Sequence, residues 1–279
     1  MPTGSFTPIR PNVSLAAVKS LTAPTPPSVT VQPLIIPEVD LIVKGQPVAG
    51  PLNVVYSTSP LSARDDDGTF YYVKGEDDPL IVLAEVLGHI LAGFVEIPVP
   101  QYAVGRFGKK GAPVFASAVV EDAVRDVSGW VKKKKVKNWD VLPRVIALDV
   151  WLANNDRNMG NLLGRAVPED DDGHIELIAI DFEKSATVRK KAPMIEIATM
   201  TPKAFWPRDE LGKLCKSTLK WDAGIMQRFD GITDGQIEQA VSASVAAVGH
   251  PDADGRDNIA HVLKKRRNNL AKLVHEVWN

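Results

Sequence analysis

The sequence predicts an α+β protein in which a small antiparallel sheet with one helix precedes a mainly helical C-terminal part. Three observations lead to this fold class. Short β-branched runs, separated by glycine, proline and aspartate, fill much of residues 34–118. A strongly apolar helical segment at 79–92 interrupts these runs, and helical spacing dominates after residue 121. With 279 residues, the chain is long enough for two lobes or two small domains.

The composition argues against several classes of protein. The formal net charge is -1, so no overall field draws the chain to nucleic acid or to an anionic membrane. The longest apolar stretch, residues 80–95, contains Glu85 and His89 and does not predict a membrane span. Cys215 is the single cysteine, which excludes an internal disulfide and a zinc site built from cysteines. The N-terminus lacks the pattern of a secretory signal, and we expect a cytoplasmic protein with neither a membrane nor a nucleic acid partner.

Residues 1–32 are rich in proline, serine and threonine. Such a composition buries too little apolar surface to offset the entropy lost on folding, so we expect a mobile or extended tail. Residues 33–120 are expected to form the sheet part, with strands at 39–43, 54–56, 70–73, 102–104 and 114–116. Its helix is expected at 79–92, with Pro79 in the first turn and Gly93 as the stop.

Residues 121–279 are expected to form the helical part. A long helix is predicted at 138–154, and a strand pair follows a polar turn, at 162–163 and 175–180. Two closing helices are expected, with Asp234 and Asp257 as their N-caps. The basic runs at 132–135 and 264–267 are expected to be solvated, with contact to an acidic protein or a nucleic acid as the alternative for the first run.

The polar turn and the strand pair carry the most informative residues, in LDVWLANNDRNMGN at 148–161 and IAIDF at 178–182. Asp156 can accept or orient the proton of a hydroxyl group. Asn161 and Asp181 carry hard oxygen ligands, which suit Mg²⁺ bridging phosphates. Each residue alone is more simply interpreted as a turn or cap residue. The three together, each set among apolar residues, favour a shared phosphate-binding cleft.

The sheet part carries a second group of candidate residues. Lys74 ends the strand in FYYVKG, where its ammonium can hold nucleotide phosphates. Glu85 lies in the apolar helix, where a buried carboxylate needs a partner, so we predict a Lys74–Glu85 ion pair; the alternative places Glu85 on a solvated face. The serine-rich segment STSPLS, with Ser57, Ser59 and Ser62, is a candidate phosphate loop or else a surface hairpin. The sequence contains neither a P-loop lysine motif nor G-x-G-x-x-G.

In this order, the segments VKG, AEVLGHILAG, EIPVP, FASAVVED, WLANNDRNMGNLL and IAIDFE resemble the HipA-like kinases of the protein-kinase-like superfamily. The polar turn within 148–161 is also similar to the catalytic turn of phosphatidylinositol kinases. The similarity runs from about residue 35 to the C-terminus, and the turn with its Asp-Arg start and Gly-Asn end is its most specific part. The resemblance implies a bilobal protein-kinase-like fold that uses ATP and Mg²⁺.

The resemblance also implies a role for each matching residue. Lys74 would bind the α- and β-phosphates, and Glu85 would anchor it. Asp156 would be the catalytic aspartate, and Asn161 and Asp181 would bind magnesium.

Two further roles follow from the same resemblance. Arg157, grouped with the catalytic residues, would structure the turn or pair with an acidic neighbour. Backbone groups of a hinge near 116–121, with Ala118, Val119 and Glu121 among its residues, would take adenine.

Three features depart from the family pattern. Asn158 stands where such turns often carry histidine, Glu183 replaces the glycine that follows Asp-Phe, and the phosphate loop has no glycine. The expected activity is ATP- and Mg²⁺-dependent phosphoryl transfer to a Ser/Thr hydroxyl of a protein substrate. The alternatives are a kinase-shaped module that binds nucleotide without turnover, and a nucleotidyl transferase on the same fold.

Overall fold

The computed structural model describes residues 34–47, 61–108, 111–168, 170, 172–189, 223–249 and 253–278. All of them belong to one compact unit, Pro33–Asn279. The predicted tail at 1–32, the predicted strand at 54–56, and Ser57, Ser59 and Cys215 lie outside the described residues.

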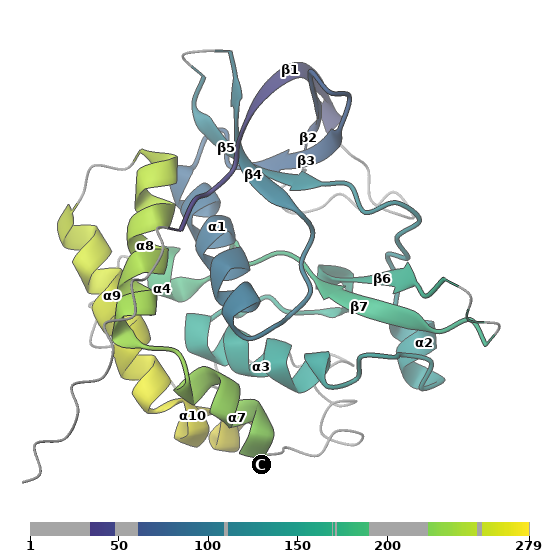
Figure 1. Ribbon diagram of the computed structural model, residues 1–279, viewed down its shortest axis with the longest axis vertical. Helices are drawn as coiled ribbons and strands as arrows, with labels where there is room; N and C mark the ends of the chain where they lie inside the picture. Colours follow the sequence, from purple (N-terminus) through teal and green to yellow (C-terminus); the bar gives the residue numbers. More distant parts are fainter. Residues whose placement is uncertain are drawn as a thin grey trace, which may run out of the picture. The chain divides into compact units, whose positions relative to one another are not determined.

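Five strands close into a barrel in the order β1-β2-β3-β5-β4 (Figure 1). The strands are β1 (Glu38–Pro47), β2 (Leu61–Asp65), β3 (Phe70–Lys74), β4 (Tyr102–Phe107) and β5 (Pro113–Ala118). Four of the pairings are antiparallel, but β1 pairs with β4 in parallel, with Glu38 opposite Val104. The prediction of a purely antiparallel sheet is therefore corrected, and closure leaves no free edge on these strands.

Strand β2 occupies a segment for which the sequence predicts a loop. Ser62 pairs with Tyr72 of β3 and is not part of a loop, because β2 begins at Leu61. The five residues LSARD have little β-propensity, and long-range pairing outweighs it. Asp65 fixes the turn that follows, since its carboxylate accepts the Thr69 N–H at 2.8 Å.

Helix α1 (Pro79–Phe94) lies beneath the barrel and is buried from Val82 to Ala92 (Figure 1). The Asp78 carboxylate accepts the Leu80 N–H at 3.0 Å and so caps the helix, while Pro79 occupies the first turn. A helix that is apolar on all sides needs burial on all sides, which makes α1 the centre of the core. Among the described residues, no helix is long and apolar enough to span a membrane.

Helix α3 (Val141–Leu152) packs beside α1 and holds the end of that helix. The Arg144 guanidinium donates to the carbonyls of Val95 and Glu96, just beyond α1, at 3.0 and 2.6 Å. The carbonyls at a helix C-terminus carry partial negative charge, which a cation stabilises. The whole of α3 is buried, including Pro143.

The C-terminal end of α3 is held by a side chain from α9 (Ala253–Asn268). Arg266 donates to the Trp151 carbonyl at 2.9 Å and to the Val150 carbonyl, and the Trp151 indole donates to Leu263 of α9 at 2.7 Å. Arg266 is 0% exposed, so the prediction that the 264–267 run is solvated is wrong for this residue. Burial lowers the pKa of Arg266 to about 10, which leaves it charged near neutral pH.

A short antiparallel pair, β6 (Leu162–Ala166) and β7 (Ile175–Ala179), follows α3 and the one-turn helix η2 (Met159–Asn161). Leu162 lies opposite Ala179 in this pair. The turn that ends at Asn161 and the segment that begins at Ile180 therefore leave the hairpin at the same end. The short helices α2 (Ser128–Lys132) and α4 (Ala186–Arg189) lie before and after this region.

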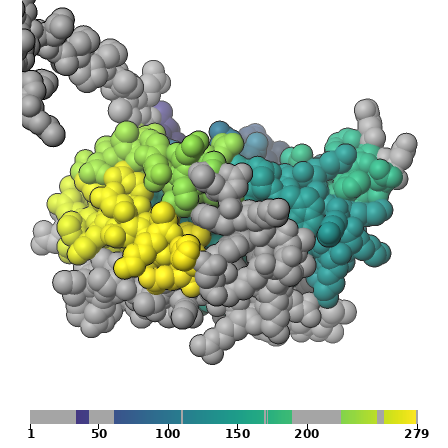
Figure 2. All heavy atoms as spheres, turned by 90° about the horizontal axis from the view of Figure 1, so that it is seen from below, coloured from purple at the N-terminus to yellow at the C-terminus, as the bar shows by residue number. Residues whose placement is uncertain are grey.

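The remaining helices of the described residues are α7 (Ala223–Asp230), α8 (Asp234–Val248), α9 and α10 (Leu270–Trp278). Seen from below, α9 and α10 in yellow form one face with α7 and α8 in green (Figure 2). Two predicted caps are wrong. Thr233, not Asp234, caps α8, through a capping box with Gln236. Helix α9 already begins at Ala253, before Asp257, and the predicted last helix is divided at Asn269.

Helix α1 meets Phe182 at Gly88. A Cβ atom at Gly88 would lie 2.4 Å from Cγ and 2.5 Å from Cβ of Phe182, which is buried. We expect Gly88→Ala to lower the free energy of unfolding by about 1–3 kcal/mol, because Phe182 or the helix must shift. Urea unfolding measures the change.

Gly93 of the same helix provides the matched control. Among the described residues, apart from the chain neighbours of Gly93 and the backbone of its own helix, no atom lies within 4 Å of a Cβ built at Gly93. Gly93→Ala should therefore raise the free energy of unfolding by up to about 1 kcal/mol through helix propensity. Equal effects of the two substitutions would contradict the close packing at Gly88.

Candidate active site

Lys74 lies at the centre of a cluster of acidic side chains. Its Nζ is 3.1 Å from Glu85 Oε1 of α1, 3.1 Å from Asp181 Oδ1 and 3.4 Å from Glu183 Oε2. The predicted Lys74–Glu85 ion pair is therefore present, and Lys74 also contacts two carboxylates of the segment that follows β7. Burial by itself would lower the pKa of Lys74, but the charges of Glu85, Asp181 and Glu183 outweigh it and raise the pKa above its usual value.

Glu85 joins three parts of the site. It is 1% exposed, which rules out the alternative of a solvated face. One carboxylate oxygen accepts from Lys74, and the other accepts the Phe182 N–H at 3.1 Å. Burial raises the pKa of Glu85, while both donors favour its charged form. Glu85 is therefore a buried carboxyl group with a donor on each oxygen.

Asp181 leaves β7 in the left-handed backbone region, with φ +68°. This conformation is unfavourable for most residues but tolerated by aspartate and asparagine. The backbone is held on both sides of Asp181. The Ile180 carbonyl accepts a hydrogen bond from Arg157, and the Phe182 N–H donates one to Glu85. The side chain of Asp181 is thereby directed at Lys74.

Arg157 fixes the polar turn from inside the protein. It is 1% exposed, and its Nε donates to Asp149 Oδ2 of α3 at 2.8 Å. The same guanidinium donates to the Asn161 carbonyl at 2.7 Å and to the Ile180 carbonyl. The prediction that it pairs with an acidic neighbour is confirmed. The Arg157 side chain is therefore buried behind the turn that it holds.

Asp156 and Asn161 lie together on the polar turn. The Asn161 side-chain amide donates to the Asp156 carbonyl at 2.8 Å, and the Ile180 N–H donates to the Asn161 carbonyl at 3.2 Å. The turn and the segment of Asp181 are therefore adjacent, as the sequence predicts. Burial, followed by the charge of Asp181, raises the pKa of Asp156, and Lys184 opposes this shift. The Asp156 carboxylate thus lies within the electrostatic reach of both.

The predicted hinge follows β5, and two of its backbone donors are already used. The Ala118 N–H donates to the Gln101 carbonyl at 2.8 Å, and the Val119 N–H donates to the Phe70 carbonyl at 2.9 Å. Val119 and Glu121 are exposed. Neither of these two N–H groups is therefore available to a bound base without rearrangement. Ser62, in β2, is half-buried, while Ser57 and Ser59 lie outside the described residues.

Sequence reasoning missed three residues of this site. Glu183, noted only as a departure from the family pattern, is 1% exposed and binds Lys74. Lys184 binds the other oxygen of the same carboxylate at 3.2 Å. Asp149 anchors Arg157 from α3. The one available signal was a charged pair, Glu-Lys, directly after the buried Asp-Phe.

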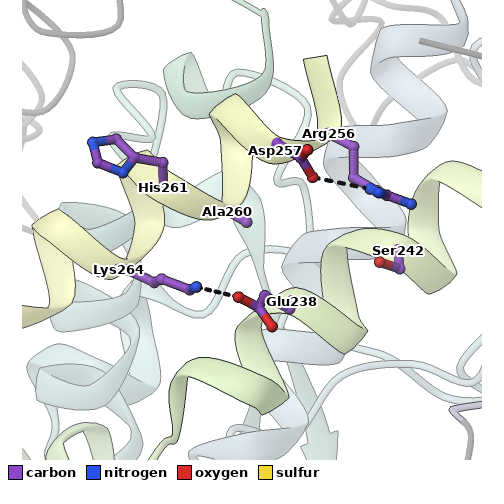
Figure 3. A pocket seen from close by; sticks show the side chains of 7 residues that line it. All are labelled: Glu238, Ser242, Arg256, Asp257, Ala260, His261 and Lys264. Atoms are coloured by element: carbon purple, nitrogen blue, oxygen red, sulfur yellow. Dashed lines mark hydrogen bonds and ion pairs between the residues drawn. The ribbon is translucent and has the colours of Figure 1, made fainter. Parts of the chain in front are cut away.

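Two other clusters lie apart from these residues. Asp170, Asp172 and His174 face one another in the β6–β7 connection, where Lys137 is 3.1 Å from Asp170. A pocket of about 380 Å³ lies between α8 and α9 (Figure 3). Its lining residues pair with one another, as Glu238 does with Lys264 and Arg256 with Asp257. Neither cluster contains a residue of the Lys74 site.

No protein-family model matches the chain, and no curated protein matches it either. Among solved structures, the proinflammatory kinase CtkA of Helicobacter pylori is similar at 13% identity and a TM-score of 0.55, over 87% of this chain and 97% of CtkA. The HipA toxin of Shewanella oneidensis MR-1, in its complex with HipB and operator DNA, is similar at 12% identity and a TM-score of 0.42, over 81% of this chain and 65% of that one. The likeness to CtkA confirms a kinase-like fold, in agreement with the resemblance predicted from the sequence.

The buried Arg157–Asp149 pair should dominate the stability of the polar turn. Arg157→Met leaves a buried carboxylate without its cation, and we expect a loss of about 3–5 kcal/mol in the free energy of unfolding. The double variant Arg157→Met/Asp149→Asn removes both charges and keeps an acceptor for Asn154, so it should be more stable than Arg157→Met alone. Urea unfolding of the full double-mutant cycle tests this; additive costs would contradict the pairing.

His89 should make stability depend on pH. Its Nδ1 lies 2.8 Å from the Glu85 carbonyl, which can only accept, and within the described chain Nε2 is buried without a partner. Burial lowers the pKa of His89 from 6.5 to about 3. Between these two pH values, His89 is therefore protonated in the unfolded chain and neutral in the folded chain. The free energy of unfolding consequently decreases as the pH falls from 6.5 towards 3.

This effect can be isolated by substitution. Between about pH 7.5 and pH 5, the wild-type protein should lose about 2 kcal/mol more free energy of unfolding than His89→Leu. Urea unfolding of both proteins at the two pH values gives the comparison. Parallel pH dependences would show that His89 is not held neutral by the fold.

Proposed function

We propose that this protein is an ATP- and Mg²⁺-dependent phosphotransferase with a bilobal arrangement, in which the nucleotide lies between residues 33–120 and residues 121–279. The observation that carries the proposal is the position of Lys74, with Glu85 and Asp181 each 3.1 Å from its ammonium. Such a lysine, fixed by a glutamate of the neighbouring helix and facing a metal-binding aspartate, serves phosphoryl transfer. The kinase-like fold supports the same activity.

The donor set fits a divalent cation. Four carboxylates, those of Glu85, Asp156, Asp181 and Glu183, stand against the two ammonium groups of Lys74 and Lys184, which leaves an excess of two negative charges in this group of residues. Asp181 and Asn161 would hold magnesium, which neutralises phosphate charge when bound. The Asn161 amide nitrogen is engaged with the Asp156 carbonyl, so the amide oxygen points away from that contact and can serve as a ligand.

Each residue of the site then has a task. Lys74 holds the α- and β-phosphates, and Glu85 keeps its ammonium in place. Asp156 orients the acceptor hydroxyl and receives its proton as the hydroxyl oxygen forms a bond to the γ-phosphorus. The bond between that phosphorus and the bridging oxygen breaks, and ADP leaves. Arg157 keeps the polar turn in register with Asp181.

The base and the acceptor complete the proposal. Adenine would meet backbone groups of residues 118–121, with the carbonyls of Ala118 and Val119 in the main role, because the N–H groups of both are already paired. The acceptor would be a Ser/Thr hydroxyl of a protein substrate, by likeness to kinases. A cytoplasmic location suits both ATP use and this substrate.

One observation favours a second candidate function, a nucleotide-binding module without turnover. Lys74 is bound by three carboxylates at once, so phosphates must compete with Glu85, Asp181 and Glu183 for its ammonium. A site that binds ATP while Lys74 stays bound to these carboxylates would not transfer the γ-phosphate. Nucleotidyl transfer is distinguished by the mass added to the acceptor.

The test has two stages. A thermal-shift titration with ATP and Mg²⁺ measures binding, and γ-labelled ATP with casein, histone and the protein itself as acceptors measures transfer. We expect both, and we expect Asp181→Asn to lose transfer by at least about a hundredfold. It should retain its fold, because asparagine also tolerates the left-handed conformation of residue 181.

The matched control is Asp257→Asn, at an exposed aspartate of the pocket between α8 and α9. It should leave binding and transfer unchanged. Full turnover by Asp181→Asn would overturn the assignment of that residue. Binding without transfer in the wild-type protein would favour the nucleotide-binding module. Transfer of a nucleotide to the acceptor would favour the nucleotidyl transferase.

A further inference from the structure

We infer that Lys184 is a catalytic residue that binds the γ-phosphate of the nucleotide, working beside Lys74 across the shared carboxylate of Glu183. This inference rests on the proposed phosphotransferase function and adds a residue to it. It explains why a charged Glu-Lys pair follows Asp181 and Phe182, where protein kinases carry a glycine.

Glu183 places the two lysines side by side. The Lys74 ammonium is 3.4 Å from Glu183 Oε2, and the Lys184 ammonium is 3.2 Å from Glu183 Oε1. Both cations therefore contact a single carboxylate, one on each oxygen. The Glu183 side chain is 1% exposed, and a buried carboxylate needs partners of this kind. The two ammonium groups are therefore neighbours across one carboxylate group.

Lys184 also lies beside the start of the polar turn. The next residue, Ser185, forms an isolated β-bridge with Asn154, two residues before Asp156. A cation between Lys74 and this turn lies along the path that the proposed mechanism gives the triphosphate. Lys74 holds the α- and β-phosphates at one end, and Asp156 holds the acceptor hydroxyl at the other. The γ-phosphate belongs between them, beside Lys184.

The other described groups near the polar turn are poorly suited to bind the γ-phosphate. Arg157 is the cation of the polar turn itself, but it is buried and bound to Asp149. The candidate phosphate loop contains no glycine, which limits the backbone N–H groups it can offer. Charge on the equatorial oxygens of the γ-phosphoryl group needs a positive partner during transfer. Lys184, whose side chain is 34% exposed, is near enough to provide it.

The inference predicts that loss of Lys184 affects the binding of ATP and of ADP differently. Only ATP carries the γ-phosphate, so Lys184→Met should weaken binding of a non-hydrolysable ATP analogue with Mg²⁺ by about tenfold or more, and leave ADP binding unchanged within about twofold. Isothermal titration gives both affinities. The rate constant kcat of transfer should fall by about a hundredfold. Lys184→Arg should recover much of the affinity for the analogue, because it restores the positive charge.

Two further variants complete the test. Lys264→Met removes a lysine that also pairs with a carboxylate, Glu238, in the pocket of Figure 3, and should change neither affinity. Lys184→Met leaves Glu183 with one partner fewer. The double variant Lys184→Met/Glu183→Gln removes that charge too and should show the same selective loss for the ATP analogue, even if the single variant folds poorly.

The outcomes distinguish this inference from the proposed function. If the wild-type protein transfers phosphate and Lys184→Met binds the ATP analogue as tightly as the wild type, the inference is wrong and the function stands. If Lys184→Met weakens ADP and the analogue equally, Lys184 is structural and the inference is again wrong. A wild-type protein that binds neither nucleotide overturns both.

Discussion

One half-buried ammonium group connects parts of this protein that are far apart in the sequence. Lys74 ends a strand of the barrel, Glu85 belongs to the central helix, and Asp181 and Glu183 follow a hairpin more than ninety residues later along the chain. Three carboxylates gathered in a poorly solvated place would repel one another strongly without a cation between them. The ammonium of Lys74 therefore orients the barrel, the helix and the hairpin relative to one another.

Arg157 is a buried cation that fixes the position of the backbone around the site. Its guanidinium is shared by a carboxylate of α3 and by two carbonyls, of Asn161 and Ile180, which belong to the two segments that carry the candidate metal ligands. Hydrogen bonds to carbonyl groups fix backbone positions and leave side chains free. The oxygen atoms of Asp156, Asn161 and Asp181 can therefore face a ligand while their main chain is held from behind.

Much of this site is readable from the sequence, because its residues are marked by local contrast. Glu85 is a charge within an apolar helix, and Asp181 ends an apolar strand, so both stand out against their neighbours. Features that depend on distant partners are not marked in this way. Strand β2 forms from a weak β-former because β1 and β3 pair with it, and the parallel contact of β1 with β4 depends on barrel closure. Arg266 looks like part of a surface run until the carbonyls of α3 are seen beside it. The roles of Ser57 and Ser59 stay predictions, as do the nucleotide and metal contacts.

The contact between Arg266 and the end of α3 has a consequence for the order in which the protein folds during synthesis. The last turn of α3 leads directly into the polar turn, and its carbonyls are satisfied by a side chain made more than a hundred residues later. Chains fold from their N-terminus as they emerge from the ribosome, at a pace of about 5–20 residues per second. A nascent chain that has already formed its barrel would still lack the clamp on α3 for several seconds. The end of α3, and with it the start of the polar turn, is thus held in its final position only when α9 has been made.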